Sequence, residues 1–149
     1  MFTEELGTLE LTEPITVASN ASTQGAIDVM NQNHVGCVLI MEKDRLCGIF
    51  TERDVLTRVV GRNLDLNEVP ISEVMTHSPE YLTVDDPVVH ALNAMIAGGY
   101  RHVPVLSAHR PVGVFGMRDS VRYIVAMHPD AVLNAPPPGM KIAARPEGG

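Results

Sequence analysis

The sequence predicts an α/β fold built from two copies of one unit, each running strand, helix, strand, strand, helix. Residues 48–54 read Gly-Ile-Phe-Thr-Glu-Arg-Asp and residues 113–119 read Gly-Val-Phe-Gly-Met-Arg-Asp, a repeat with an offset of 65 residues. Around both motifs, the spacing of apolar residues switches between strand and helix periods in the same order. The chain has 149 residues and 45% apolar content, whereas a half of about 60 residues would be marginal alone. We therefore expect both units to fold as one body.

The first unit opens with a strand at residues 15–18, followed by a segment of helical period. Two apolar runs, at 38–41 and 47–50, flank a polar turn at 42–45, which predicts a hairpin. The closing helix has apolar residues at helical spacing and a glycine at its end, namely Val55, Leu56, Val59, Val60 and Gly61.

The second unit follows the same plan. After a strand at 81–84, Asp86 has the position of a helix cap with Pro87 as the first helical residue, and Gly98-Gly99 ends that helix. The remaining elements are strands at 103–106 and 112–115 around a turn at 107–111, and a helix with Val121, Ile124 and Val125 that stops at Pro129.

Three motifs occur in an order typical of one known family. They are Gly-hydrophobic-x-Thr-x-x-Asp at 48–54, Val74-Met75-Thr76 at the start of the second unit, and Val103-Pro104-Val105. With them the sequence resembles a pair of CBS (cystathionine beta-synthase) domains, the Bateman module, over residues 8–129. The resemblance implies two β-α-β-β-α units packed sheet against sheet as a pseudo-symmetric pair. It also implies clefts between the units that often hold adenosyl ligands.

The resemblance divides the chain into five parts. These are an N-terminal segment at 1–7, a first CBS unit at 8–65, a linker at 66–74, a second CBS unit at 75–129 and a Pro-rich C-terminal tail at 130–149. Pro136 to Pro138 favour an extended polyproline stretch. The tail is either a disordered end or, through residues 131–133, a docking arm, and it resembles the extensions of small stand-alone bacterial CBS proteins.

The repeated motif allows two interpretations. Thr51 and Asp54 have the spacing of a helix capping box, in which the carboxylate serves the backbone. Alternatively, a tight turn at Gly48 lets the backbone approach a ligand, and a carboxylate accepts well from the two hydroxyls of a ribose. Asp119 recurs although Gly116 replaces the threonine, which favours the ligand interpretation. We expect ribose sites at both aspartates, as the resemblance implies, with unequal affinities.

Arg101 and His102 precede the Val103-Pro104 run, where the first unit has Gly36-Cys37. The resemblance implies that basic residues here contact phosphates, although a solvated strand edge is the alternative. Arg53 and Arg118 lie inside the motifs and are weaker candidates for the same role. Candidates for the adenine pocket, by resemblance and with plain core as the alternative, are Thr16, Val17, Thr83, Val84, Val103 and Pro104.

Composition excludes several classes of protein. A net charge of −7 argues against general affinity for nucleic acid or anionic lipid. The sequence shows no apolar run of membrane-spanning length and no basic leader, so we expect a cytoplasmic location without membrane contact. The six histidines show no metal-ligand spacing, and we expect no metal site.

The two cysteines lie in the strands of the first predicted hairpin. A turn at Lys43 and Asp44 places Cys47 opposite Ile40 and Cys37 opposite Phe50, so no disulfide is set up by the register. We expect buried, reduced thiols in place of a redox switch.

The sequence shows no catalytic constellation and no obligatory cofactor, so we do not expect an enzyme. The favoured hypothesis is a stand-alone regulatory module that senses energy state by binding AMP, ADP, ATP or S-adenosylmethionine between its units. It would signal to a protein partner and, as the family resemblance implies, form a homodimer. The alternative is a ligand-free dimerising scaffold with degenerate clefts, which Gly116 favours and the intact pair of Thr51 and Asp54 opposes.

Overall fold

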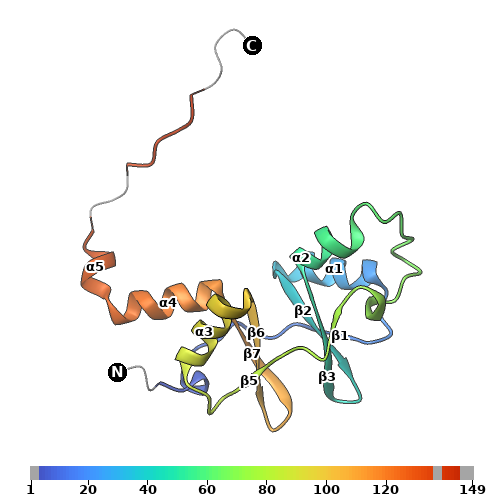
Figure 1. The fold of residues 1–149 in the computed structure, drawn as a ribbon, viewed down its shortest axis with the longest axis horizontal. Coiled ribbons are helices and arrows are strands. Elements are labelled where there is room, and N and C mark those ends of the chain that lie inside the picture. The colour runs from blue at the N-terminus through green and yellow to red at the C-terminus, as the bar shows by residue number, and fades with distance from the viewer. Residues whose placement is uncertain (1–3, 136–138, 145–149) are drawn as a thin grey trace.

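A computed structural model describes residues 4–135 and 139–144. The chain forms two β-sheets (Figure 1). In the first sheet, β1 is parallel to β2, and β3 and β4 continue antiparallel; in the second, β5 is parallel to β6, and β7 is antiparallel. The strand bounds are β1 Thr16–Ala18, β2 Cys37–Glu42, β3 Arg45–Thr51, β4 Thr76–His77, β5 Leu82–Thr83, β6 His102–Ser107 and β7 Arg110–Gly116.

The helices alternate with these strands as the sequence predicted. The Ser22 hydroxyl caps the first helix by accepting from the Gly25 N–H at 3.0 Å, and Gly99 ends the third in the left-handed conformation. The helix after β3 is three residues long and continues as a π-helix over Val55–Val59. The helix bounds are α1 Thr23–Asn33, α2 Glu52–Asp54, α3 Val88–Gly98, α4 Met117–Met127 and α5 Pro129–Leu133.

Asp86 does not cap the third helix, and that prediction was wrong. Pro87 occupies the cap position, and α3 begins at Val88 without a side-chain cap. The Asp86 carboxylate instead accepts from the N–H of Thr83 at 2.7 Å and from its hydroxyl at 3.1 Å. The carboxylate therefore closes the tight turn before the helix, a competing use of short acidic side chains.

The C-terminal part differs from the predicted tail at its start, because Pro129–Leu133 form the short helix α5. Residues 139–144 are exposed and extend away from the body (Figure 1). The predicted polyproline stretch at 136–138 lies outside the described residues. Among the described helices, none is both long and apolar enough to cross a membrane.

The first hairpin turns at Lys43 and Asp44 as predicted, with φ angles of 49° and 62°. A β-bulge between Ile40 and Met41 shifts the register, so Cys37 lies opposite Thr51 and not opposite Phe50. A bulge inserts one residue into one strand, and the apolar spacing of the sequence did not reveal it.

Both cysteines are free, but only Cys37 is buried as predicted, whereas Cys47 is half-buried. Burial, assisted by the charge of Glu52, raises the pKa of the Cys37 thiol to about 12. Burial also raises the pKa of Cys47, whose thiol donates to the carbonyl of Ile40 at 3.3 Å. Because the thiolate is the reactive form, neither group is set up for redox chemistry.

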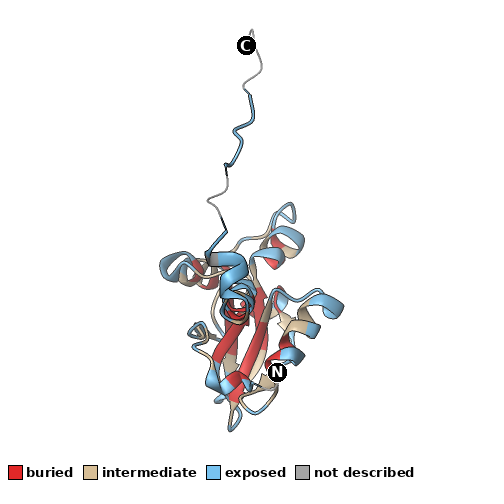
Figure 2. Cartoon of the chain, turned by 90° about the vertical axis from the view of Figure 1, so that its left-hand side faces the viewer, coloured by how far each residue is buried: buried red, intermediate tan, exposed pale blue. Residues whose placement is uncertain are grey.

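Successive side chains along a strand point to opposite faces of the sheet and enter two different cores. In β2, Val38 and Ile40 pack with α1 residues in the core of the first unit. Cys37 and Leu39 point to the other face and join Ile49 of β3 and Val114 of β7. The buried residues lie mainly along the strands (Figure 2). The two sheets therefore pack against each other, which confirms the predicted pair of α/β units.

The segment that leads into each unit packs on the other unit. Leu6 is fully buried in the core of the second unit, where its N–H donates to the Asp86 carbonyl at 2.9 Å. Ile71, 65 residues later, is fully buried in the core of the first unit, and its N–H donates to the Ala21 carbonyl at 2.9 Å. We call residues 4–12 the N-terminal crossing segment and residues 71–77 the middle crossing segment. The two units are thus interlocked twice.

The sequence suggested a tight turn for a ligand at Gly48, and this prediction was wrong. Gly48 lies inside β3. A Cβ atom there would collide with the side chain of Met75, and one on Gly113 would lie 2.7 Å from Cβ of Leu11. The repeated glycine therefore makes room for the crossing segment at the same place in each unit.

Candidate functional site

Two clefts lie between the units, and they are related by the repeat. Cleft 1 has a volume of about 530 Å³ and is lined by the end of β3 and α2 from the first unit and by residues 99–102 from the second. Cleft 2 has a volume of about 240 Å³ and is lined by β7 and α4 from the second unit and by residues 34–37 from the first. Each cleft therefore combines the motif of one unit with the loop before the central strand of the other.

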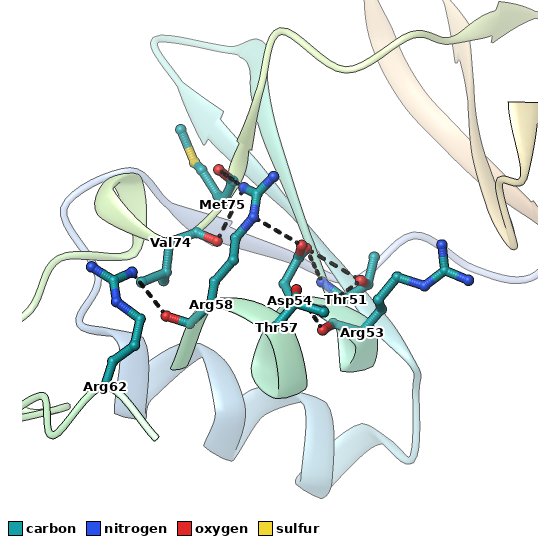
Figure 3. A network of polar contacts seen from close by, with 8 residues as sticks. All are labelled: Thr51, Arg53, Asp54, Thr57, Arg58, Arg62, Val74 and Met75. Atoms are coloured by element: carbon teal, nitrogen blue, oxygen red, sulfur yellow. Dashed lines mark hydrogen bonds and ion pairs between the residues drawn. The ribbon is translucent and has the colours of Figure 1, made fainter. Parts of the chain in front are cut away.

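In cleft 1, Thr51 and Asp54 form the capping box (Figure 3). Asp54 Oδ2 accepts from the Thr51 N–H at 2.9 Å and from its hydroxyl at 3.2 Å, and the Thr51 hydroxyl accepts from the Asp54 N–H at 3.3 Å. The other oxygen, Oδ1, lies 3.5 Å from Nε of Arg58. The capping interpretation is realised, and it uses one carboxylate oxygen, which leaves Oδ1 as the atom available to a ligand hydroxyl.

The opposite wall of cleft 1 contains Tyr100, Arg101 and His102. Arg101 is exposed, as a phosphate-binding group requires. Burial lowers the pKa of His102, and Arg101 adds to this, while the charge of Glu52 opposes it. The surroundings therefore favour the neutral form of this imidazole. It also lines cleft 2, so one side chain faces both cavities.

The lining residues that the sequence reasoning missed include Tyr100 and Arg58. Tyr100 donates its hydroxyl to Glu80 at 3.1 Å, and both residues line cleft 1. Its signal in the sequence is an aromatic residue directly before the Arg-His pair. Arg58 lies four residues after Asp54, the spacing of an ion pair on a helix. The charged side chains that line cleft 1 are three arginines and three acids: Arg53, Arg58, Arg101, Glu52, Asp54 and Glu80.

Cleft 2 differs in the partners of its aspartate, because a threonine of the N-terminal crossing segment takes the place of the arginine. Asp119 Oδ2 accepts from the Gly116 N–H at 2.8 Å and from the Thr12 hydroxyl at 3.1 Å, and Oδ1 lies 3.3 Å from the same hydroxyl. Thr12 forms a bridge with Val114, just as Thr76 pairs with Ile49 in the first sheet. The sequence could hardly have identified Thr12 as a partner of Asp119. The only common feature is that a threonine with a proline nearby precedes the opening strand of each unit.

The structure separates the predicted site residues into two groups. Cleft 1 brings together Thr51, Arg53, Asp54, Arg101, His102 and Pro104, and cleft 2 brings together His102, Arg118 and Asp119. The remaining candidates line neither cleft. Val17 and Val84 pack against the two cores, Val103 is buried in the second core, Thr83 binds Asp86, and Thr16 is exposed on β1. Within residues 4–135 and 139–144, no group of three His, Cys, Asp or Glu side chains is arranged to hold a metal ion.

The fold is a tandem pair of α/β units with clefts between them. The family model described as "CBS domain" matches residues 6–61 and 71–126, so the chain belongs to the CBS domain family and carries the domain twice. The Arabidopsis thaliana CBS domain-containing protein CBSCBSPB5 is 36% identical over 99 residues, which covers 66% of this chain and 18% of that protein. The chain thus spans less than a fifth of that relative.

Solved structures give the same fold. A protein with CBS domains from Burkholderia ambifaria MC40-6 has a TM-score of 0.70 and 26% identity, covering 77% of this chain and 84% of that one. The CBS domain protein PAE2072 from Pyrobaculum aerophilum, solved as a complex with AMP, has a TM-score of 0.71 and 24% identity, covering 83% and 98% of the two chains.

Proposed function

We propose that this chain is a regulatory module that binds an adenine nucleotide in cleft 1 and reports its presence to a protein partner. The observation that carries the proposal is that one cavity joins Asp54 of the first unit to Arg101 and His102 of the second. Its volume of about 530 Å³ lies within the usual range for small-molecule sites. The AMP complex of the similar protein PAE2072 supports this choice of ligand.

Each part of the nucleotide has a suitable group in the cleft. Asp54 Oδ1 would accept from the ribose hydroxyls. Arg101 would bind the phosphate, for which a guanidinium is well shaped. The ring of Tyr100 and the apolar surfaces of Ile49 and Pro104 would hold the adenine. Because S-adenosylmethionine has no phosphate for Arg101 to bind, AMP, ADP and ATP fit this cleft better.

The regulatory role follows from the position of the cleft between the units. A ligand that contacts both units shifts the population toward the arrangement it binds more tightly. We assign no catalytic step to the chain, and we propose that it senses the balance of adenine nucleotides in the cytoplasm.

A homodimer is part of the proposal. Leu56, in the π-helix, and Val121, on α4, are related by the repeat and are 71% and 54% exposed. Met117 and Ile124 on α4, and Val60 directly after the π-helix, are also exposed apolar residues. A surface repeated in both units suits a self-complementary contact with a second chain. Glutamate at Leu56 and Val121 together should convert the dimer to a monomer in multi-angle light scattering.

Calorimetric titration of the full chain with AMP, ADP, ATP, S-adenosylmethionine, adenosine and GTP tests the function. The proposal expects selective binding of an adenine nucleotide. Arg101→Met should weaken AMP binding by about tenfold or more and adenosine binding little, because only AMP carries the phosphate. Arg110→Met is the control, since Arg110 is exposed at the far end of β7.

A second function has one observation in its favour, the engagement of Asp119 by Thr12 in cleft 2. If no ligand binds to a folded, dimeric protein, the chain is a scaffold whose clefts are closed. Equal losses for AMP and adenosine in Arg101→Met would remove Arg101 from the phosphate role.

A further inference from the structure

Arg58 connects the candidate ligand carboxylate to the middle crossing segment (Figure 3). Its Nε lies 3.5 Å from Asp54 Oδ1, and its Nη1 donates to the carbonyl of Met75 at 2.6 Å and lies 3.5 Å from the carbonyl of Val74. Met75 directly precedes Thr76, which lines cleft 1. One guanidinium therefore touches a group in the cleft and the backbone that joins the two units.

The repeat shows what is particular to this arginine. The residue 65 positions later is Tyr123, whose hydroxyl donates to the Glu4 carboxylate at 2.8 Å, in the N-terminal crossing segment. Arg58 and Tyr123, at the same position of the two units, therefore each donate a hydrogen bond to a crossing segment. A phenol carries no positive charge to attract an aspartate, so only the first unit adds a link to its cleft.

The geometry of Arg58 suits a link that responds when a ligand occupies cleft 1. Arg58 presents five N–H donors in one plane, and the short bond to Met75 fixes that plane against the backbone. The approach to Asp54 is longer, and the Arg58 side chain is 42% exposed, so the ion pair is the weaker of the two contacts. A hydroxyl that binds Oδ1 competes with Arg58 for the same lone pairs.

We propose that Arg58 is a positioning residue that couples the state of the Asp54 carboxylate to the placement of the middle crossing segment. The proposal rests on the proposed function only in taking Asp54 as the group that meets the ligand. When a ligand hydroxyl replaces Arg58 at Oδ1, the guanidinium is released toward the backbone carbonyls, and the segment between the units shifts with it.

The reporter is the amide exchange of Val74 and Met75. Their N–H groups donate to the Ile71 carbonyl at 3.1 and 3.0 Å, so their exchange measures the local opening of the crossing segment. Hydrogen exchange with NMR detection, without ligand, is compared for the wild type, Asp54→Asn, Arg58→Met and the double variant. Asparagine keeps a carbonyl oxygen for the Thr51 N–H, and methionine keeps the apolar stem of the arginine.

We expect the effects of the Asp54 and Arg58 substitutions on amide exchange to be non-additive. Asp54→Asn should speed exchange at the two amides by about twofold to fivefold, the range of a partly exposed ion pair. In the Arg58→Met background, the same substitution should change nothing further. Arg58→Lys should restore part of the coupling, because an ammonium keeps the charge but not the fork of donors. Arg62→Met is the control, since the side-chain hydrogen bond of Arg62 among the described residues goes to the Arg58 carbonyl and not to the crossing segment.

Additive effects, or an equal acceleration in Arg62→Met, would overturn the proposal. If Arg58→Met does not fold, Arg58→Lys takes its place in the cycle. A titration with AMP then separates the coupling through Arg58 from the proposed binding of a nucleotide in cleft 1. AMP should change the exchange of both amides in the wild type and bind to Arg58→Met without that change. If AMP still changes the exchange in Arg58→Met, the coupling is wrong although the function holds; if AMP binds neither protein while the cycle is non-additive, the function fails and the coupling stands.

Discussion

The hydroxyl of Thr12 donates a hydrogen bond of 3.1 Å to Oδ2 of Asp119, and this contact makes the two clefts unequal. Asp119 is the second of the two aspartates in the repeated motif, and it is 4% exposed. Thr12 belongs to the N-terminal crossing segment, which reaches β7 through a bridge to Val114. Thr12 would therefore compete for this carboxylate with any hydroxyl that entered cleft 2.

Thr12→Val should release Asp119 for a ligand while keeping the shape of the side chain. Without ligand, we expect the free energy of unfolding to fall by about 1 kcal/mol, because a buried carboxylate loses a hydrogen bond. With AMP, the calorimetric stoichiometry should rise from one site per chain toward two. Urea unfolding and AMP titration measure the two effects.

Thr8→Val is the matched control for this variant, because the Thr8 hydroxyl bonds only to Glu5 in its own segment among the described contacts. An unchanged stoichiometry in Thr12→Val, together with the expected loss of stability, would show that Thr12 is not what closes cleft 2.

Asp54→Ala and Asp54→Asn should have different effects on stability. Alanine removes the capping partner of Thr51 and should lower the free energy of unfolding by about 0.5–2 kcal/mol. Asparagine can still accept from the Thr51 N–H, so we expect a smaller loss. Both variants should bind AMP less tightly, since the charged acceptor for the ribose is gone. Denaturant unfolding and calorimetry, with Asp85→Asn at an exposed position as control, check this.

A result in which both Asp54 variants keep the wild-type affinity for AMP would assign Asp54 to capping alone. Equal stabilities of the alanine and asparagine variants would instead show that the cap contributes little.

Gly116→Thr should be tolerated and should stabilise the second unit. Gly116 has φ of −108° and ψ of −177°, extended backbone that any residue adopts. A Cβ atom there would have its nearest neighbours at 3.7–3.8 Å, which is ordinary van der Waals contact. The free energy of unfolding should rise by about 0.4–1 kcal/mol, because the unfolded chain loses freedom. Thermal unfolding measures the gain.

The matched variant is Gly113→Thr, where the Cβ would lie 2.7 Å from Leu11. We expect this variant to be clearly destabilised. Similar melting temperatures for the two threonine variants would contradict the packing described for the crossing segments.

The pH dependence of stability should contain a contribution from His102. Burial lowers the pKa of this imidazole in the folded protein, so the unfolded chain binds a proton more readily. Stability should therefore fall as the pH drops through the ordinary histidine pKa of about 6.5. His102→Gln should reduce the slope of melting temperature against pH between about 7 and 5.5.

His90→Gln is the control, because His90 is exposed on α3. A slope that is the same in His102→Gln and in the wild type would mean that the imidazole is not kept neutral by the fold.

The sequence alone determined the local elements and the chemical types at the site. Apolar spacing predicted the order of strands and helices in both units. Each element buries one face, so its apolar residues recur with the period of a strand or a helix over a short stretch of sequence. The repeat identified Asp54 and Asp119 as equivalent, and the Arg101-His102 pair as the difference between the units. Misplaced details, such as the cap at Asp86 and the register of Cys37, arose where two local uses of the same residues compete.

Only the tertiary structure decided which residues meet. The sequence placed Leu6 in the N-terminal segment and Ile71 in the linker, and it did not show that each is buried in the other unit, because a leucine or isoleucine fits either core. That crossing brings Thr12 to Asp119 and the Met75 carbonyl to Arg58, and it places Arg101 in the cleft of Asp54. These contacts join residues far apart in the chain, and their geometry depends on how the two sheets pack, which no short stretch of sequence encodes.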